Sequence, residues 1–296
     1  HYIILFYYSA SYSSEKTMPN SFLGIIFGMT SALVWGAGDF AGGYATRKQS
    51  QYQVLALAAF SGLAFLTVAE IFLQESFPSN RGILFSVLGG FSGALGIAAF
   101  YRALATGNAA VVAPTAAVIG TILPVLFSAV FEGLPTPTKL CGFGLAVLGI
   151  WLVSTNSTHN SASLTGFALA SFAGIGFGGF MIFLGNVDHG KILTPLLIAR
   201  SIALLTGLAL VKANRLPIPS LKSNLVALVC GVLDTGGNLF FVLAKQYTRL
   251  DVAAVLSSLG PAVTVIIATL VLKDPVSGRQ WIGVLTCLAS VAMITV

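Results

Sequence analysis

The most constraining feature of this chain is a succession of apolar stretches, each close to the roughly 20 residues that a helix needs to cross a bilayer. Five such stretches precede a polar seam at residues 155–163, and five follow it. We predict membrane-spanning helices, in chain order, at residues 21–44, 53–73, 82–104, 109–131, 139–154, 164–187, 193–211, 224–244, 252–272 and 280–296. The expected fold is an all-α integral membrane protein with ten transmembrane helices, whose two ends lie on one side of the bilayer.

The composition excludes a soluble protein. Charged residues make up only 8% of the chain and the mean hydropathy is +0.92, whereas about a quarter of the residues of a soluble domain are charged. The 15 Lys and Arg residues are scattered singly between the stretches, a pattern typical of interfacial anchors and not of a nucleic-acid partner. The Cys and His residues lack metal-ligand spacing, so we predict no metal and no cofactor.

The two halves of the chain are related to each other. Residues 120–142 match residues 261–283 at a constant offset, with Lys273 in the position of Glu132. Because each half holds five spans, the halves have opposite orientations, which is typical of secondary transporters. We predict a first five-helix repeat at residues 18–154, a linker at 155–163 and a second repeat at 164–296. Residues 1–17 are expected to be a non-native or disordered N-terminal extension, since they lack a basic region and a small-residue cleavage site.

Several short motifs carry a resemblance to a known family. They are Trp35-Gly36, Phe100-Tyr101-Arg102-Ala103-Leu104, Gly107-Asn108-Ala109-Ala110, Leu250-Asp251-Val252-Ala253-Ala254, Gly260-Pro261 and Gln280-Trp281-Ile282-Gly283. With them the chain resembles the EamA family of the drug/metabolite transporter superfamily over residues 21–296. The resemblance implies inverted repeats around a central cavity, transport of small metabolites by alternating access, often outward, and both termini in the cytoplasm.

The chain also departs from the family pattern. Gly260 precedes Pro261 where family members often have a glutamate, and the first span carries Asp39 and one extra residue after its Trp-Gly pair. The substrate class of typical members is therefore not carried over to this chain.

Polar residues inside the spans are the candidates for function, because each is costly in a bilayer unless it is paired or hydrated. Asp234 lies near mid-membrane, and Asn238 lies one helical turn later on the same face. Asp234 either exchanges protons in a cavity or locks helices together through hydrogen bonds. Asp39 follows Trp35 by one turn, so it either lines the same cavity or pairs with Arg47 or Lys48 near the interface.

Two arginines also lie within predicted spans. Arg200 is central in its span and requires either a partner or a hydrated cavity, unless its side chain snorkels. The partner could be Asp234, Asp39 or an anionic substrate. Arg102 lies near the end of its span, where snorkelling is the alternative to a place in the cavity, and Tyr101 beside it offers an amphipathic ring. The predicted substrate-binding set is Trp35, Asp39, Tyr101, Arg102, Arg200, Asp234 and Asn238.

From these observations we predict a secondary active transporter in the cytoplasmic membrane, of the bacterial inner-membrane type. It would export a small organic metabolite, such as an amino acid, an amine or a drug-like compound, with coupling to protons. The alternatives are a metabolite or sugar importer of the same fold and a structural or sensory membrane protein. No catalytic set is visible, so an enzyme is not expected. The expected partners are the substrate and the bilayer, and a homodimer is left open.

Overall fold

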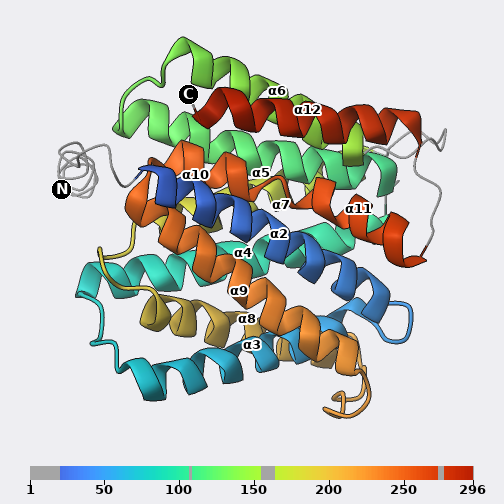
Figure 1. Cartoon of the computed structure of the whole chain (residues 1–296). Helices are drawn as coiled ribbons and strands as arrows, with labels where there is room; N and C mark the ends of the chain where they lie inside the picture. Colours follow the sequence, from blue (N-terminus) through green and yellow to red (C-terminus); the bar gives the residue numbers. More distant parts are fainter. Residues whose placement is uncertain (1–20, 107–108, 155–163, 273–276, 296) are drawn as a thin grey trace.

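The computed structural model describes residues 21–106, 109–154, 164–272 and 277–295, and the regular structure in these ranges is helical (Figure 1). The first half forms α2 (Ser21–Ala45), α3 (Gln51–Leu73), α4 (Asn80–Thr106), α5 (Ala109–Phe131) and α6 (Pro137–Ser154). The second half forms α7 (Leu164–Gly185), α8 (Leu193–Ala213), α9 (Leu225–Tyr247), α10 (Leu250–Ser257), α11 (Gly260–Leu272) and α12 (Gly278–Thr295). The predicted all-α fold is confirmed, whereas the predicted extension at 1–17, the linker at 155–163 and Lys273 lie outside the described residues.

Nine of the ten predicted spans correspond to one helix each, whereas the span predicted at residues 252–272 is one crossing made of two consecutive helices. Two helices, α10 and α11, occupy that span because Pro261 has no backbone N–H and cannot continue the hydrogen-bond ladder. Gly260 and Pro261 open α11, where a missing N–H costs least. Counting α10 and α11 as one crossing, the described helices traverse the bundle ten times, and eight apolar stretches are long enough to cross a membrane.

The helices of the two halves pack in a symmetric pattern. The first crossing of each half packs against the third crossing of the other, in the pairs α2 with α9 and α4 with α7 (Figure 1). The second crossings pair as α3 with α8, and the fifth crossings pair as α6 with α12. Exchanging the halves leaves these pairs unchanged, as expected for two inverted five-helix repeats.

Small residues let these helices approach closely, because a bilayer provides no hydrophobic drive for helix association. In the α4 and α7 pair, a Cβ added at Gly176 would lie 2.5 Å from the Cα atom of Gly96. In the α3 and α9 pair, a Cβ added at Gly231 would lie 2.0 Å from the carbonyl oxygen of Ala58. Close backbone contact therefore sets the relative positions of helices that carry the candidate site.

The bundle has two ends, which we name from the start of α2. The N-terminal end holds the first residue of α2, the last residue of α12 and the loops at 74–79, 132–136, 186–192 and 248–249 (Figure 1). The opposite end holds the loops at 46–50 and 214–224. At the opposite end, Asn224 accepts a hydrogen bond from the N–H of Ala227 at the start of α9 and donates one to the carbonyl of Ala45.

Candidate functional site

Three charged side chains lie close together within membrane-spanning helices. Asp39 is carried by α2, Arg200 by α8 and Asp234 by α9. The helices α2 and α9 run antiparallel, and a Cβ added at Gly38 would lie 3.2 Å from the backbone nitrogen of Asp234. This close approach brings Asp39, which follows Gly38, next to the charged part of α9. We call Asp39, Arg200 and Asp234 the interior cluster.

Arg200 and Asp234 form an ion pair inside the bundle. The Nη2 group of Arg200 donates a hydrogen bond to Oδ2 of Asp234. The Arg200 side chain is 8% exposed and the Asp234 side chain is 40% exposed, so the pair has one buried and one accessible partner. Among the partners that the sequence left open for Arg200, the structure thus places Asp234 in contact.

The guanidinium of Arg200 keeps unused hydrogen-bonding capacity. Its Nε atom is buried and has no hydrogen-bond partner in the described structure. An unsatisfied donor of this kind is costly in a low-dielectric interior. A ligand that offered an oxygen atom at this point would satisfy it.

Asp39 is the third charged member and has an accessible side chain although it lies well inside α2. It is close enough to Asp234 for the two carboxylates to repel each other, and the Cys230 thiol lies near all three charges. Two carboxylates and one guanidinium leave one negative charge uncompensated when both acids are ionised. The interior cluster therefore favours the binding of one further positive charge.

Trp35 and Asn238 lie beside this cluster. The indole N–H of Trp35 donates to the backbone carbonyl of Asp234 at 3.1 Å, and its ring stacks on Phe241 with centroids 6.0 Å apart. A Cβ added at Gly237 would meet the indole ring at 2.2 Å, so a glycine is needed for this ring position. Asn238 is 6% exposed, one turn beyond Asp234. Five of the predicted site residues, Trp35, Asp39, Arg200, Asp234 and Asn238, are therefore carried by α2, α8 and α9.

The other two predicted site residues come from α4. Arg102 is exposed near the end of that helix, a position that fits the snorkelling alternative. The side chain of Tyr101 lies outside the described part of the structure. The assignment of Tyr101 and Arg102 to the site stays a prediction.

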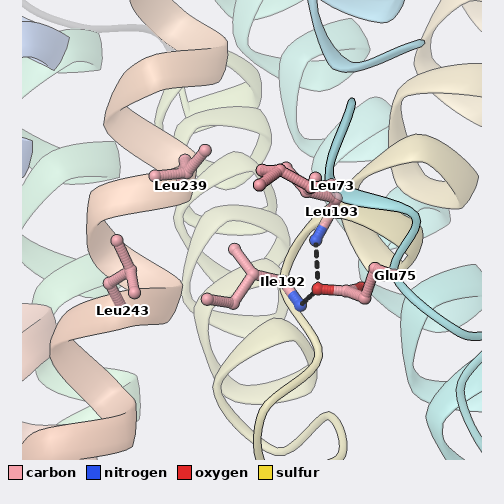
Figure 2. Close-up of a pocket in the computed structure, with 6 residues that line it drawn as sticks. All are labelled: Leu73, Glu75, Ile192, Leu193, Leu239 and Leu243. Atoms are coloured by element: carbon pink, nitrogen blue, oxygen red, sulfur yellow. Dashed lines mark hydrogen bonds between the residues drawn. The ribbon is translucent and has the colours of Figure 1, made fainter. Parts of the chain in front are cut away.

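An apolar pocket of about 370 Å³ lies nearer to the N-terminal end. It is bounded by the end of α3, the start of α8 and the second half of α9. Figure 2 shows five aliphatic side chains lining it, with Glu75 at its edge. The Glu75 carboxylate accepts hydrogen bonds from the N–H groups of Ile192, Leu193 and Thr194 at 2.8, 3.3 and 3.0 Å. Glu75 thus caps the helix that carries Arg200 and fixes where α8 begins.

A second group of charges lies at the N-terminal end and joins the two halves. Nζ of Lys245, in the last turn of α9, lies 3.0 Å from Oε1 of Glu132, which follows α5. Oε2 of Glu132 accepts hydrogen bonds from the Ser128 hydroxyl at 2.5 Å and from the N–H of Leu250 at 3.1 Å. Both charged side chains are largely buried, at 9% exposed for Glu132 and 13% for Lys245.

Arg249 and Asp251 complete this group. Nη2 of Arg249 lies 2.9 Å from Oδ2 of Asp251, whose side chain is fully buried and also accepts a hydrogen bond from the N–H of Val252. Arg249 also donates to the carbonyls of Glu132 and Gly133 at 2.9 and 2.6 Å, so it binds the first half. We call Glu132, Lys245, Arg249 and Asp251 the end cluster.

The partners of Glu132 keep this carboxyl ionised. Burial by itself would raise the pKa of Glu132. The Lys245 ammonium and the hydrogen bonds from Ser128, Lys245 and the Leu250 N–H outweigh burial, and the pKa of Glu132 is lowered. The end cluster is thus a balanced set of two positive and two negative charges.

The sequence analysis missed the end cluster as a functional group. Each of its members, taken alone, has the position of an ordinary interfacial charge at the end of a span. The available signal was that Glu132, Lys245 and Arg249 come from different halves but fall on the same side of the predicted membrane.

Comparisons with known proteins bear on the family and the fold. The model of the EamA-like transporter family matches residues 22–155 and 160–296. Proteins named "Putative sugar uptake protein" from Streptococcus pyogenes serotype M1 and from serotype M3 strain MGAS315 are each 23% identical over 281 residues, covering 89% of this chain and 93% of theirs. A crystal structure of a protein matches with a TM-score of 0.74 at 17% identity, covering 91% of this chain and 95% of that one. The structural match supports the fold alone.

Proposed function

We propose, from the premise that the chain belongs to the EamA-like transporter family, that it is a secondary active transporter exchanging protons for a small organic cation. The family is a transporter family, and the chain is a multi-pass membrane protein. The resemblance drawn from the sequence is confirmed by the family match. The proposal beyond that concerns the substrate, the coupling and the direction.

The charge count of the interior cluster is the observation that carries the proposal. Arg200 is paired with Asp234, which leaves the carboxylate of Asp39, within a membrane-spanning helix, without a compensating cation among the described residues. An uncompensated charge there is expensive, so Asp39 favours either a proton or the positive group of a substrate. Because one carboxylate cannot hold both, loading the substrate displaces the proton. Competition for Asp39 then couples the two movements in opposite directions.

Two features support an organic substrate over a bare ion. The buried Nε of Arg200 lacks a hydrogen-bond acceptor, which an oxygen atom of the substrate, next to its positive group, would provide. Trp35 and Phe241 place stacked aromatic rings beside the same part of α9. An amine that also carries a hydroxyl, carbonyl or carboxylate would satisfy these groups together.

We place the transporter in the cytoplasmic membrane of a bacterium, with both termini in the cytoplasm and the substrate moving outward. The usual inward proton gradient would then drive export by exchange. The sequence contains no Walker A motif, so the proposal uses an ion gradient and not ATP.

A second candidate function is sugar uptake. It is favoured by the names of the Streptococcus pyogenes relatives, which align over 89% of this chain. Sugar hydroxyls could donate to Asp39 and accept from Arg200, and Trp35 could provide an aromatic surface. In that case the proton and the sugar would move in the same direction.

The first test compares the cell contents and spent medium of cells that overproduce the wild-type protein or Asp39→Asn at equal membrane amounts, by untargeted mass spectrometry. An amine enriched in the medium only with the wild type supports the proposal. A sugar enriched inside the cells only with the wild type favours the second candidate. Identical profiles for the two proteins would contradict the role of Asp39 in either function.

A further inference from the structure

The end cluster crosses the boundary between the two halves at one end of the bundle. Glu132 and Gly133 belong to the turn after α5, whereas Lys245, Arg249 and Asp251 belong to the segment from α9 into α10. The contacts between the halves include side chains and backbone groups, among them four at distances between 2.6 and 3.1 Å. The halves are therefore fastened together at this point by charge-assisted hydrogen bonds.

An apolar layer separates the end cluster from the interior cluster. The fully buried side chains of Leu184, Phe241 and Leu250 belong to it, packed with Leu196 and Ala253 in one hydrophobic core cluster. On α9, Lys245 comes eleven residues after Asp234, a rise of about 16 Å at 1.5 Å per residue. A substrate at the interior cluster would have to pass both barriers to leave through the N-terminal end.

Among the residues that the structure describes, the hydrogen bonds between the two halves at the opposite end come from uncharged side chains. The Gln49 side chain donates to the Ser223 hydroxyl at 2.8 Å, Gln53 donates to the carbonyl of Pro217 at 2.8 Å, and Asn224 donates to the carbonyl of Ala45 at 3.0 Å. Asp39 lies about two turns from this end of α2 and has an accessible side chain. The interior cluster is thus nearer to the end whose described contacts between the halves are neutral hydrogen bonds.

We propose that the end cluster is the gate of the N-terminal end, which holds the transporter closed on that side. It opens when the Glu132 and Lys245 pair separates and Arg249 releases the carbonyls of Glu132 and Gly133. This inference rests on the proposed function, since only alternating access requires such an opening. The gate belongs to the turn after α5 and to the connection from α9 to α10, so opening moves α10 and the end of α9 away from α5.

The physical properties of a buried ion pair suit such a gate. The attraction between Glu132 and Lys245 is largely offset by the cost of removing both charges from water. When the pair separates into water, each charge recovers its hydration, so opening costs less than exposing an equal apolar surface. Arg249 and Asp251 stay paired with each other within the second half and can move as one unit.

The test measures access to the apolar layer from the N-terminal end. Ala253 is fully buried in α10, just beyond the end cluster, and becomes the reporter as Ala253→Cys in a chain whose three native cysteines are replaced by serine. A membrane-impermeant maleimide is added to sealed vesicles of each orientation, and the labelling rate is measured. We expect Glu132→Gln to be labelled about tenfold faster than the parent from the N-terminal side, the factor that corresponds to about 1.4 kcal/mol.

Three variants control the experiment. The exchange Glu132→Lys with Lys245→Glu should return labelling to within about threefold of the parent, because it rebuilds the pair. Lys139→Gln removes a charge at the same end from a residue outside the end cluster and should leave the rate unchanged. Lys245→Met removes the positive charge of the Glu132 and Lys245 pair. It takes the place of Glu132→Gln in the experiment if Glu132→Gln does not fold.

Parental labelling rates in folded Glu132→Gln and Lys245→Met would overturn the proposal. Fast labelling that persists in the charge exchange would also overturn it, since general loosening of the helices would then be the cause. The assay needs no substrate, so failure here removes the gate alone. Failure of the proposed function would instead appear as identical metabolite profiles for the wild type and Asp39→Asn.

Discussion

The two charged clusters of this molecule differ in how completely their members are paired. In the end cluster, two acids meet two bases, and the carboxylates of Glu132 and Asp251 also accept backbone or hydroxyl hydrogen bonds. In the interior cluster, Arg200 pairs with Asp234 and its Nε has no partner in the described structure, while Asp39 lies near Asp234 without a described ion-pair partner. Paired charges can hold the halves together, whereas the unpaired capacity of the interior cluster is available to a ligand.

The largest expected effect concerns the interior cluster, whose charges are not fully paired. Asp39→Asn removes the uncompensated charge, and we expect proton-coupled transport to fall to the level of protein-free vesicles. The measurement is the decay of an imposed pH gradient in proteoliposomes after a mixture of small organic cations is added. The matched control is Glu70→Gln, an acid-to-amide change near the end of α3, which should keep transport within about twofold of the wild type.

The free energy of unfolding of variants tests the end cluster, whose charges are paired. Breaking a buried ion pair from one side leaves the other charge unpaired, so Glu132→Gln should lower the free energy of unfolding by about 3 kcal/mol. Asp39→Asn should leave it within about 0.5 kcal/mol or raise it, because that variant removes repulsion from Asp234. Chemical denaturation in detergent micelles measures both variants. Equal losses of stability in the two would erase the distinction between the clusters.

The pH dependence of stability sharpens the same distinction. Lys245 and Arg249 are the described charged groups that face Glu132, and the pKa of Glu132 is lowered from its ordinary value of 4.5. A lowered folded-state pKa means that the stabilisation is complete above about pH 4.5 and is lost as the pH falls through the folded-state pKa. The difference in stability between the wild type and Glu132→Gln should therefore shrink at acidic pH. A difference that stays constant as the pH falls would contradict the role assigned to the ionised carboxylate.

The smallest expected effect concerns the support of the interior cluster. Trp35→Phe keeps an aromatic ring against Phe241 but removes the indole hydrogen bond to the carbonyl of Asp234, which should cost about 1 kcal/mol of stability. The control is Trp281→Phe on the exposed face of α12, where a smaller loss is expected. Thermal unfolding of the two variants side by side provides the measurement.

Much of the fold could be predicted from the sequence because span length is set by the bilayer. The predicted span at residues 109–131 matches α5 at both ends, and the predicted start at Ser21 matches α2. Pro261 inside a span predicts a kink, but many membrane helices tolerate a proline, and only the packing environment decides that the helix is fully interrupted between α10 and α11. Local signals were sufficient for helices but not for the interruption.

The candidate site could be predicted only in part. The sequence identified Asp39, Arg200 and Asp234 from the cost of charge in a bilayer, but it left the partner of Arg200 open. That choice depends on the approach of α2, α8 and α9, which the glycines at their contacts allow and no local pattern reveals. The end cluster was missed for the same reason, since its members become a group only when the two halves meet.

The most direct test of the central claim is an infrared titration of the protein in lipid, which follows the carbonyl band of protonated carboxyl groups. The account predicts that the wild type and Glu132→Gln share a band component that Asp39→Asn lacks, and that added organic cations remove this component. A spectrum that is unchanged by Asp39→Asn would contradict the claim that the interior cluster exchanges a proton for substrate at Asp39.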